Sequence, residues 1–500
     1  MSVIEPESSN ATAPTPGIAP GSDNIDAHTV AQELAEIWAG GGRPGTQASL
    51  IQRAVPGFDA PFFQAGLAGY SDAAMRIIAR RHGCPFCVTE ALLDRTMLAG
   101  GRGFAKADLG ELHENVPSGP EDHPLACQIM GSNPGEMSAA ALKAAEQGKQ
   151  GEKFYRTMAY GNKSGYFPST RVALRLPGGE QLPPMSELDA SEGLGESCGD
   201  FEEETCETLV DQINDMASLD GAASVSERSL ESRRGASDSP EHGGASGTLG
   251  PELSFECIDV NLACPVKKIK AKARGGHWLA EPEGAIRILE AVREAVPASI
   301  PCSVKLRRSF DDTPEMAQNI HTILDAAHAM GYAWATVHAR TVMQKYVGPS
   351  RWDLLRDIVR RQRGQSGDAG MPIFGSGDIW NAADIFRMIA YTGVAAVAVA
   401  RGCIGNPWIF RQARAMMAGR PPTPPTIAEQ RAVLEDHFRL LLAVNHGMRQ
   451  GEEHTSKLMR KFGIRFATHH PRTNEARLRF IGVKSDADWR AVLDEMYAPA

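Results

Sequence analysis

The sequence contains no uninterrupted apolar run approaching the roughly 20 residues that a membrane span needs, although 42% of its 500 residues are hydrophobic. It has no Lys or Arg before Arg43, so we expect neither a secretory signal nor a transit peptide. The nine cysteines are an odd number and thinly spread, which argues against a disulfide framework. These absences predict a cytoplasmic protein without a membrane segment.

The only CxxC pattern is Cys84-Pro-Phe-Cys87, with neither a second pair nor a suitably spaced pair of histidines. A structural zinc site needs four such ligands. We therefore interpret this motif as packing at the start of a strand, and we expect no metal.

Negative charge is concentrated in one segment of the chain. The formal net charge is −9, but residues 149–253 alone contain 19 acidic and 9 basic residues, which leaves +1 for the remainder. A nucleic-acid partner is therefore not excluded by the overall charge, because local basic patches decide phosphate binding.

Composition divides the chain into segments. Residues 1–50 are expected to form a disordered tail, poor in large apolar side chains up to residue 27, and then a short helix over His28–Ala39. The acidic, Gly- and Ser-rich residues 149–253 are expected to be a partly disordered insertion. Helical periodicity over 427–449 and 456–468 predicts a small helical C-terminal domain over 426–500.

Between residues 55 and 420, short β-rich runs alternate with helix-length segments, which predicts an α/β fold built as a (β/α)8 TIM barrel. The expected strands are Pro61–Ala65, Phe86–Thr89, Leu125–Met130, Glu256–Asn261, Cys302–Leu306, Trp334–His338, Pro372–Gly375 and Ala395–Ala400. The expected helices are Asp72–His82, Pro134–Gln147, Pro282–Ala295, Pro314–Met330, Trp352–Arg363, Asn381–Tyr391 and Pro407–Met417.

The residues that follow the strands are the first candidates for a site, because barrel enzymes carry their active sites at these ends. Gly375-Ser376-Gly377-Asp378 and Ala400-Arg401-Gly402 follow the seventh and eighth strands, where backbone N–H groups and an arginine can hold a phosphate. Lys305, His338 and Arg340 end the fifth and sixth strands, which favours an electron-rich ring or an anion. Each of these three alone is also explained as a solvated charge or a hydrogen-bonded core histidine.

Asn261-Leu-Ala-Cys264-Pro265 follows the fourth strand and leads into a basic run of Lys267, Lys268, Lys270, Lys272 and Arg274. A cysteine on such a loop beside cations is positioned to exchange a proton. The basic run is either a solvated face or a contact to nucleic-acid phosphates.

These blocks together resemble the tRNA-dihydrouridine synthase family. The resemblance rests on Asn261–Pro265 with the lysines that follow, on His338–Gly348, on Gly375–Asp378 and on Arg401–Phe410. It covers roughly 60–148 and 254–470 and implies an FMN-binding TIM barrel whose C-terminal domain binds tRNA. The implied reaction reduces uridines in tRNA to dihydrouridine, with FMN recharged by NADPH.

The resemblance also implies roles for individual residues. Cys264 matches the general acid, and Asn261 the residue that contacts the uracil; Lys268, His338 and Arg340 are the other expected substrate contacts. The expected FMN contacts are Ala65, Gly66, Leu67, Ala68, Gln128, Lys305, His338, Ser376, Gly377, Asp378, Ala400 and Arg401.

The first strand is followed by Ala65-Gly-Leu-Ala68 where the family usually has Ala-Pro-Met-Ala. Two other functions remain open at this point. One is a flavin-barrel reductase of a small molecule, similar to dihydroorotate dehydrogenase. The other is a tRNA-binding homologue without catalysis.

Overall fold

The computed structural model of the protein describes residues 21–99, 119–150, 152–160, 254–264, 275–366, 370–445 and 451–498. The chain divides into two units, one formed by Met1–Gly165 with Leu253–Ala500 and the other by Tyr166–Glu252. The second unit lies outside the described residues, so the structure concerns the first.

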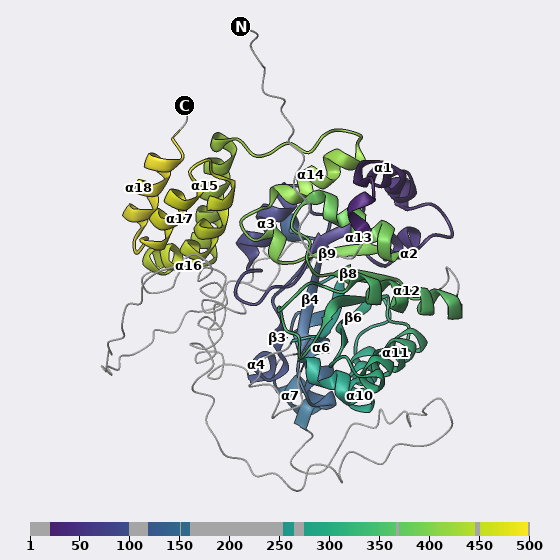
Figure 1. The fold of residues 1–500 in the computed structure, drawn as a ribbon. Helices are drawn as coiled ribbons and strands as arrows, with labels where there is room; N and C mark the ends of the chain where they lie inside the picture. Colours follow the sequence, from purple (N-terminus) through teal and green to yellow (C-terminus); the bar gives the residue numbers. More distant parts are fainter. Residues whose placement is uncertain are drawn as a thin grey trace, which may run out of the picture. The chain divides into compact units, whose positions relative to one another are not determined.

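A closed sheet of parallel strands forms the centre of this unit (Figure 1). Its strands are β1 Phe62–Gln64, β2 Cys87–Val88, β3 Leu92–Leu93, β4 Leu125–Met130, β5 Cys257–Leu262, β6 Cys302–Ser309, β7 Trp334–Thr341, β8 Ile373–Ser376 and β9 Ala396–Val399. They follow one another around the barrel, and the pairing of β2 with β4 closes it.

The predicted TIM barrel is thereby confirmed, and all eight expected strands are present within three residues of their expected ends. The additional strand, β3, pairs with β4 just beyond the pairing of β2 with β4. Thus β2 and β3 together occupy one strand position of an eight-stranded barrel.

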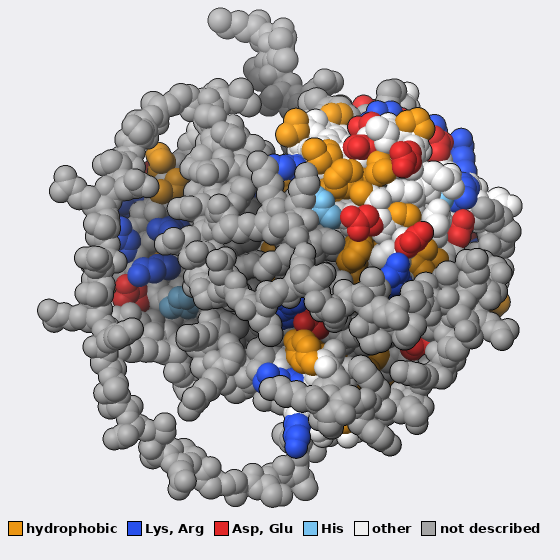
Figure 2. Space-filling view, turned by 90° about the horizontal axis from the view of Figure 1, so that it is seen from below, with side chains coloured by type: hydrophobic (Ala, Val, Ile, Leu, Met, Phe, Trp, Pro, Cys, Tyr) orange, Lys and Arg blue, Asp and Glu red, His pale blue; other side chains and the backbone are white. Residues whose placement is uncertain are grey.

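Helices surround the strands. They are α3 Ala73–Arg81, α4 Asp94–Ala99, α6 Pro134–Ala145, α7 Glu152–Tyr160, α10 Pro282–Ala295, α11 Pro314–Ala329, α12 Trp352–Ser366, α13 Ala382–Thr392 and α14 Trp408–Met417. Several begin at polar caps: Asp72 accepts from the Met75 amide, and Asn381 with Asp384 forms a capping box. Acidic and basic side chains are interspersed over the coloured part of the face in Figure 2.

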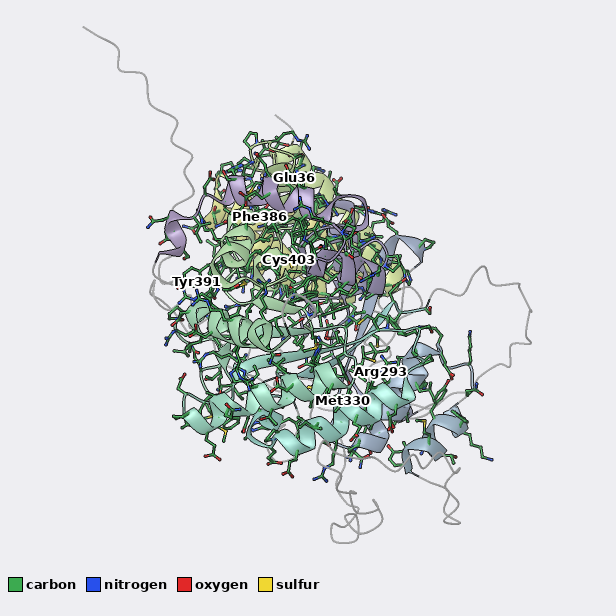
Figure 3. All side chains as sticks on the ribbon, turned by 90° about the vertical axis from the view of Figure 1, so that its right-hand side faces the viewer. Glu36, Arg293, Met330, Phe386, Tyr391 and Cys403 are labelled. Atoms are coloured by element: carbon green, nitrogen blue, oxygen red, sulfur yellow. The ribbon has the colours of Figure 1, made fainter. Side chains whose placement is uncertain are left out.

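Two helices before β1 pack on the barrel, α1 Ala27–Trp38 and α2 Gln47–Ala54. α1 contacts α13 and α14, and Figure 3 shows this side with Glu36 of α1 and Phe386 of α13 labelled. The expected helix is confirmed, but α2 was not predicted. Within the tail that was expected to be disordered, Ser22–Asn24 form a 3-10 turn; the first twenty residues lie outside the described part, so the expectation for them stays a prediction.

Phe58 closes the barrel interior at the end where the strands begin. Its ring stacks on Phe86 at 4.9 Å and meets Phe63, Trp334 and Phe374 edge-on. Such a fully buried aromatic cluster fills this end of the barrel with apolar side chains. The polar opening is therefore left to the opposite end.

The beginning of the expected insertion belongs to the barrel unit. Helix α7 lies within residues 149–253 and packs on α6, where the Tyr155 hydroxyl donates to Glu146 at 2.9 Å. Residues 161–253 lie outside the described part of the chain.

The C-terminal segment consists of α15 Ile427–Val444, α16 Gly451–Phe466, α17 Thr473–Ile481 and α18 Asp486–Met496. α15 packs against α3 of the barrel, and Arg81 forms an ion pair with Asp436 across this contact. The ammonium of Lys461 on α16 donates to the Gly69 carbonyl in the loop after β1. Among the described residues, no helix is long and apolar enough to cross a membrane.

Candidate active site

A pocket opens at the carboxyl ends of β1, β6, β7, β8 and β9, and it encloses about 550 Å³ not filled by atoms, open solvent included. Ten expected site residues line it: Ala65, Gly66, Leu67, Lys305, His338, Ser376, Gly377, Asp378, Ala400 and Arg401. Sequence reasoning missed its other lining residues, Tyr346, Ile379, Trp380 and Ala398.

The loop after β8 is suited to a small anionic group. Gly377 has φ +121°, a conformation that favours glycine, and its carbonyl accepts from the Trp352 indole at 3.0 Å. Beside it, the buried Ser350 hydroxyl has no hydrogen-bond partner among the described residues. A Cβ at Gly402 would clash with the Ile379 carbonyl, so glycine is required there.

Asp378 organises the two arginines of the pocket. Arg340 donates to both of its carboxylate oxygens and to the Gly348 carbonyl, whereas Arg401 reaches it only at 3.3 Å. Only 4% of the Arg340 side chain is exposed, against 29% for Arg401. Arg401 therefore faces the pocket, and Arg340 fixes the loop around it.

Two aromatic rings flank Arg401. Its guanidinium lies 4.7 Å from the ring centroid of Tyr346 and 4.9 Å from that of Trp380, and Arg307 lies over the same Tyr346 ring at 5.4 Å. These cation–π contacts hold the cations without neutralising them. The rim thus combines positive charge with an aromatic face that is 42% exposed at Tyr346.

Lys305 and His338 lie at the floor of the pocket, and the pKa of each is lowered. Burial and the neighbouring Arg307 lower the pKa of Lys305 to about 8, although Asp259 and Cys264 act in the opposite direction. Burial, together with the charges of Arg307, Lys305, Arg340 and Arg401, holds the pKa of His338 well below its usual range. At neutral pH His338 is therefore an uncharged imidazole beside several cations.

Cys264 lies on a loop held by three backbone contacts. Asn261 accepts from the Ala263 amide at 2.9 Å, Arg307 donates to the Ala263 carbonyl at 3.0 Å, and the Gly276 amide donates to the Cys264 carbonyl at 2.9 Å. Of the seven cysteines in the described part, Cys264 is the one that is not buried. Cys264 does not line the pocket, but it lies close enough to Lys305 and Arg307 for its charge to raise the pKa of both, against the larger effect of burial.

The expected basic run cannot be located in the structure. Lys267, Lys268, Lys270, Lys272 and Arg274 lie outside the described residues, as does Pro265. Their predicted contacts to tRNA therefore stay predictions.

Two expected contacts lie deeper than the pocket surface. Gln128 and Asn261 are buried, and the Asn261 amide donates to Gln128 Oε1 at 2.7 Å.

The loop after β1 passes close to β2, since a Cβ at Gly66 would clash with the Thr89 carbonyl. The loop after β1, which lacks the family's proline, is instead held by the Ser71 side chain, which contacts the Leu67 amide and the Ala65 carbonyl. Ala68 is part of this loop but does not line the pocket.

The C-terminal helices add cations near this end of the barrel. On α16, Lys461 lies over the Tyr70 ring. Burial is the main cause that lowers the pKa of Arg401, and the charges of Arg340 and of Arg465 on α16 act in the same direction. Arg460 on the same helix is exposed and Arg465 is half-buried. This α16 edge offers positive charge to a large anionic partner.

Comparisons with known proteins agree with these features. A family model described as dihydrouridine synthase (Dus) matches residues 238–488. A probable tRNA-dihydrouridine synthase of Mycobacterium leprae is 35% identical over 214 residues, which are 41% of this chain and 52% of the relative. One of Treponema pallidum is 32% identical over 243 residues, which are 47% of this chain and 67% of the relative.

Among solved structures, that of morphinone reductase in complex with tetrahydroNAD aligns with 73% of this chain and 89% of the reductase chain. The sequence identity is 12% and the TM-score 0.33, so the similarity carries no conclusion. The chain spans about half the length of the mycobacterial relatives that it matches. The family match itself covers just over half of the chain, and the chain therefore belongs to the dihydrouridine synthase family.

Proposed function

We propose that this protein reduces uridines in tRNA to dihydrouridine, using FMN that is recharged by NADPH. The observation that carries the proposal is that Lys305, the uncharged His338 and the half-buried Cys264 lie at the carboxyl ends of the neighbouring strands β5, β6 and β7. The relatives named as probable tRNA-dihydrouridine synthases support the same reaction.

The pocket fits a flavin mononucleotide. Gly377 and Arg401 both line the pocket, and the Ser350 hydroxyl beside Gly377 has no hydrogen-bond partner among the described residues; these groups would suit a phosphate. Lys305 and His338 lie on the floor, where they would face the ring system. Ala65, Gly66 and Leu67 border the pocket on the β1 side, and the small side chains of Ala65 and Gly66 would allow a planar ring to approach the backbone there.

Within this proposal the chain supplies orientation and a proton. A reduced flavin provides the hydride for one carbon of the uracil double bond. Cys264 would protonate the other carbon, and Asn261 would hold the base. The positive charge of Lys305 and Arg307 nearby stabilises the thiolate that remains.

The proposed partner is a tRNA whose target base leaves its stack to enter the pocket. The exposed Tyr346 ring at the rim supports base stacking. Arg460 and Arg465 on α16, and the basic run 267–274, would contact phosphates.

The test is to purify the protein, record its visible spectrum and mix the NADPH-reduced protein with tRNA that lacks dihydrouridine, without oxygen. We expect a flavin spectrum, reoxidation of the flavin by the tRNA, and dihydrouridine detected by mass spectrometry. A colourless protein that binds tRNA would instead favour the non-catalytic homologue. A yellow protein that is reoxidised only by small molecules would favour the small-molecule reductase.

A further inference from the structure

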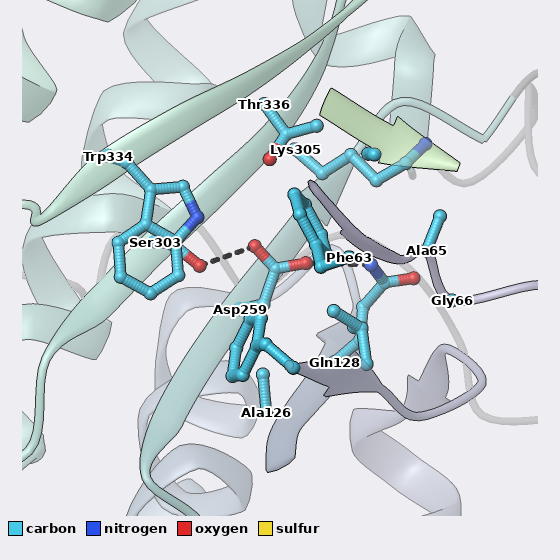
Figure 4. Close-up of a pocket in the computed structure, with 13 residues that line it drawn as sticks. Phe63, Ala65, Gly66, Ala126, Gln128, Asp259, Ser303, Lys305, Trp334 and Thr336 are labelled. Atoms are coloured by element: carbon cyan, nitrogen blue, oxygen red, sulfur yellow. Dashed lines mark hydrogen bonds between the residues drawn. The ribbon is translucent and has the colours of Figure 1, made fainter. Parts of the chain in front are cut away.

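A continuous chain of hydrogen bonds runs beneath the pocket, from the Cys264 loop into the barrel interior. The Ala263 amide donates to Asn261 Oδ1 at 2.9 Å, Asn261 Nδ2 donates to Gln128 Oε1 at 2.7 Å, and Gln128 Nε2 donates to Asp259 Oδ2 at 2.7 Å. The Ser303 hydroxyl donates to the other oxygen of Asp259 at 2.6 Å (Figure 4). Asp259 is therefore the end of the chain.

The direction of this chain is fixed at both ends. A backbone N–H can only donate, so the Ala263 amide requires the oxygen of Asn261 on its side. The Asn261 nitrogen then faces Gln128, whose oxygen must accept, and the Gln128 nitrogen must find an acceptor at Asp259. Turning either amide over would set two donors or two acceptors against each other.

This direction decides what the two amides offer to a ligand. Each side-chain oxygen already accepts one hydrogen bond inside the chain, and each nitrogen donates one of its two hydrogens there. What remains on each of Asn261 and Gln128 is one N–H donor, together with one acceptor lone pair on the oxygen. Flavin and uracil rings carry carbonyl oxygens and ring nitrogens that accept such donors.

We propose that Asp259 is a positioning residue, which fixes the amides of Gln128 and Asn261 so that both present N–H donors to the flavin and the uracil. The inference rests on the proposed function for the identity of these ligands. Asp259 is 4% exposed and borders, together with Gln128, a second cavity whose lining shares Ala65, Gly66, Lys305 and Ala398 with the pocket. Both oxygens of the Asp259 carboxylate are used by Gln128 and Ser303, so it acts through the amides and not by contact with the reacting atoms.

Burial of the Asp259 carboxylate costs free energy unless hydrogen bonds or opposite charges compensate for the lost water. Burial raises its pKa, while the hydrogen bonds from Ser303 and Gln128 and the charge of Lys305 favour the carboxylate. A nonpolar residue would pack in this position without such a cost, so the carboxylate is explained by what it orients.

Three variants separate orientation from packing. Asp259→Ala removes the final acceptor and leaves the buried Gln128 nitrogen unsatisfied. Asp259→Asn can still accept from Gln128 through its oxygen while its nitrogen donates to Ser303. The matched control, Ser303→Ala, removes the other hydrogen bond of the same carboxylate and leaves the bond to Gln128 in place.

The readouts are the dissociation constant of FMN from the apoprotein and the absorbance maxima of the bound flavin, with thermal unfolding as the check of folding. We expect Asp259→Ala to weaken FMN binding about tenfold, or about 1.4 kcal/mol, and to shift the spectrum, because the Gln128 amide is no longer held in the orientation that binds the flavin. Asp259→Asn should restore most of the affinity, and Ser303→Ala should bind FMN like the parent. Equal FMN affinity in Asp259→Ala and Ser303→Ala, or a folded Asp259→Asn as weak as Asp259→Ala, would overturn the inference.

A double-mutant cycle keeps the test valid if Asp259→Ala does not fold. Asp259→Leu removes the acceptor but keeps a side chain of similar size; if Asp259 acts through Gln128, the effects of Asp259→Leu and Gln128→Leu on FMN affinity should not add, whereas additive effects would overturn the inference. Reoxidation by tRNA is measured separately. A parent that binds FMN but is not reoxidised by tRNA would contradict the proposed substrate, and the FMN comparison would still decide the role of Asp259.

Discussion

Arg340 donates hydrogen bonds of 2.8 and 2.7 Å to the two carboxylate oxygens of Asp378, and the side chains of both residues are at most 9% exposed. This pair neutralises the carboxylate that would otherwise repel a phosphate in the same loop. It also leaves Arg401, the more exposed arginine, with its charge directed at the pocket. Arg340 therefore holds the loop through Asp378, whereas Arg401 offers its positive charge to a ligand in the pocket.

We accordingly predict that Arg401→Ala weakens FMN retention without unfolding the barrel. Loss of a charge-assisted hydrogen bond costs about 1.5–3 kcal/mol, which corresponds to roughly ten- to hundredfold in affinity. The measurement is the flavin-to-protein ratio after gel filtration, together with the dissociation constant of FMN. Arg387→Ala is the control, because Arg387 pairs with Asp384 on α13 and does not line the pocket. An unchanged flavin content in Arg401→Ala would place the phosphate elsewhere.

The barrel and the end that carries the candidate site could be predicted from the sequence, because a short β-rich run and the polar residue after it are adjacent in the chain. Lys305, His338 and Gly377 each follow a short β-rich run, and parallel strands bring such residues to the same edge. Arg307 was missed because β6 was expected to end at Leu306, whereas it continues to Ser309. The alternation of side chains along a strand would have placed Arg307 on the same face as Lys305.

Contacts between distant residues could not be predicted in this way. Asp378 looked like a phosphate-loop residue, but its partner Arg340 lies 38 positions earlier. Phe58 stands in a loop, where no periodicity marks it as the residue that closes the barrel. The carboxylate of Asp259 looked like part of a buried strand, and only its bond to Gln128 reveals a role.

The positive edge of α16 should contribute to tRNA binding in a salt-dependent way. We expect the double variant Arg460→Ala, Arg465→Ala to weaken tRNA binding at low salt and to reduce the slope of log affinity against log salt by about one unit for each phosphate that is no longer bound. The measurement is tRNA binding by fluorescence anisotropy over a range of salt concentrations. Arg53→Ala on α2, at the opposite end of the barrel, should keep the parental slope. The same slope in the double variant would exclude this edge from the interface.

Buried histidine makes the fold sensitive to acid. His437 is fully enclosed, neither ring nitrogen has a partner among the described residues, and burial with the charge of Lys461 lowers its pKa to about 3, against the opposing effect of Asp436. The unfolded chain takes up this proton near pH 6.5. Between these two values the unfolded state binds more protons, so the free energy of unfolding falls as the pH decreases below 6.5.

His437→Leu should therefore flatten the pH dependence of stability between pH 6.5 and 5, by up to about 1.4 kcal/mol per pH unit. Urea unfolding at several pH values measures this slope. Val433→Ala on the same helix is the control, since it removes buried packing and should lower stability equally at every pH. A slope in His437→Leu as steep as that of the parent would show that His437 does not govern the acid sensitivity.

Cys264 should be the proton donor of the proposed reaction, because it is the one cysteine of the described part that is not buried and lies close to Lys305 and Arg307. Cys264→Ala should still bind FMN and accept electrons from NADPH, since neither step uses the thiol. Removal of a positioned acid typically slows a reaction by about a hundred- to ten-thousandfold, so uridine reduction should become very slow. The measurement is the reoxidation of the pre-reduced variant by unmodified tRNA without oxygen. The control Cys302→Ala removes a buried thiol at the start of β6 and should retain the parental rate per folded molecule. Reoxidation of Cys264→Ala at the parental rate would remove this cysteine from the mechanism.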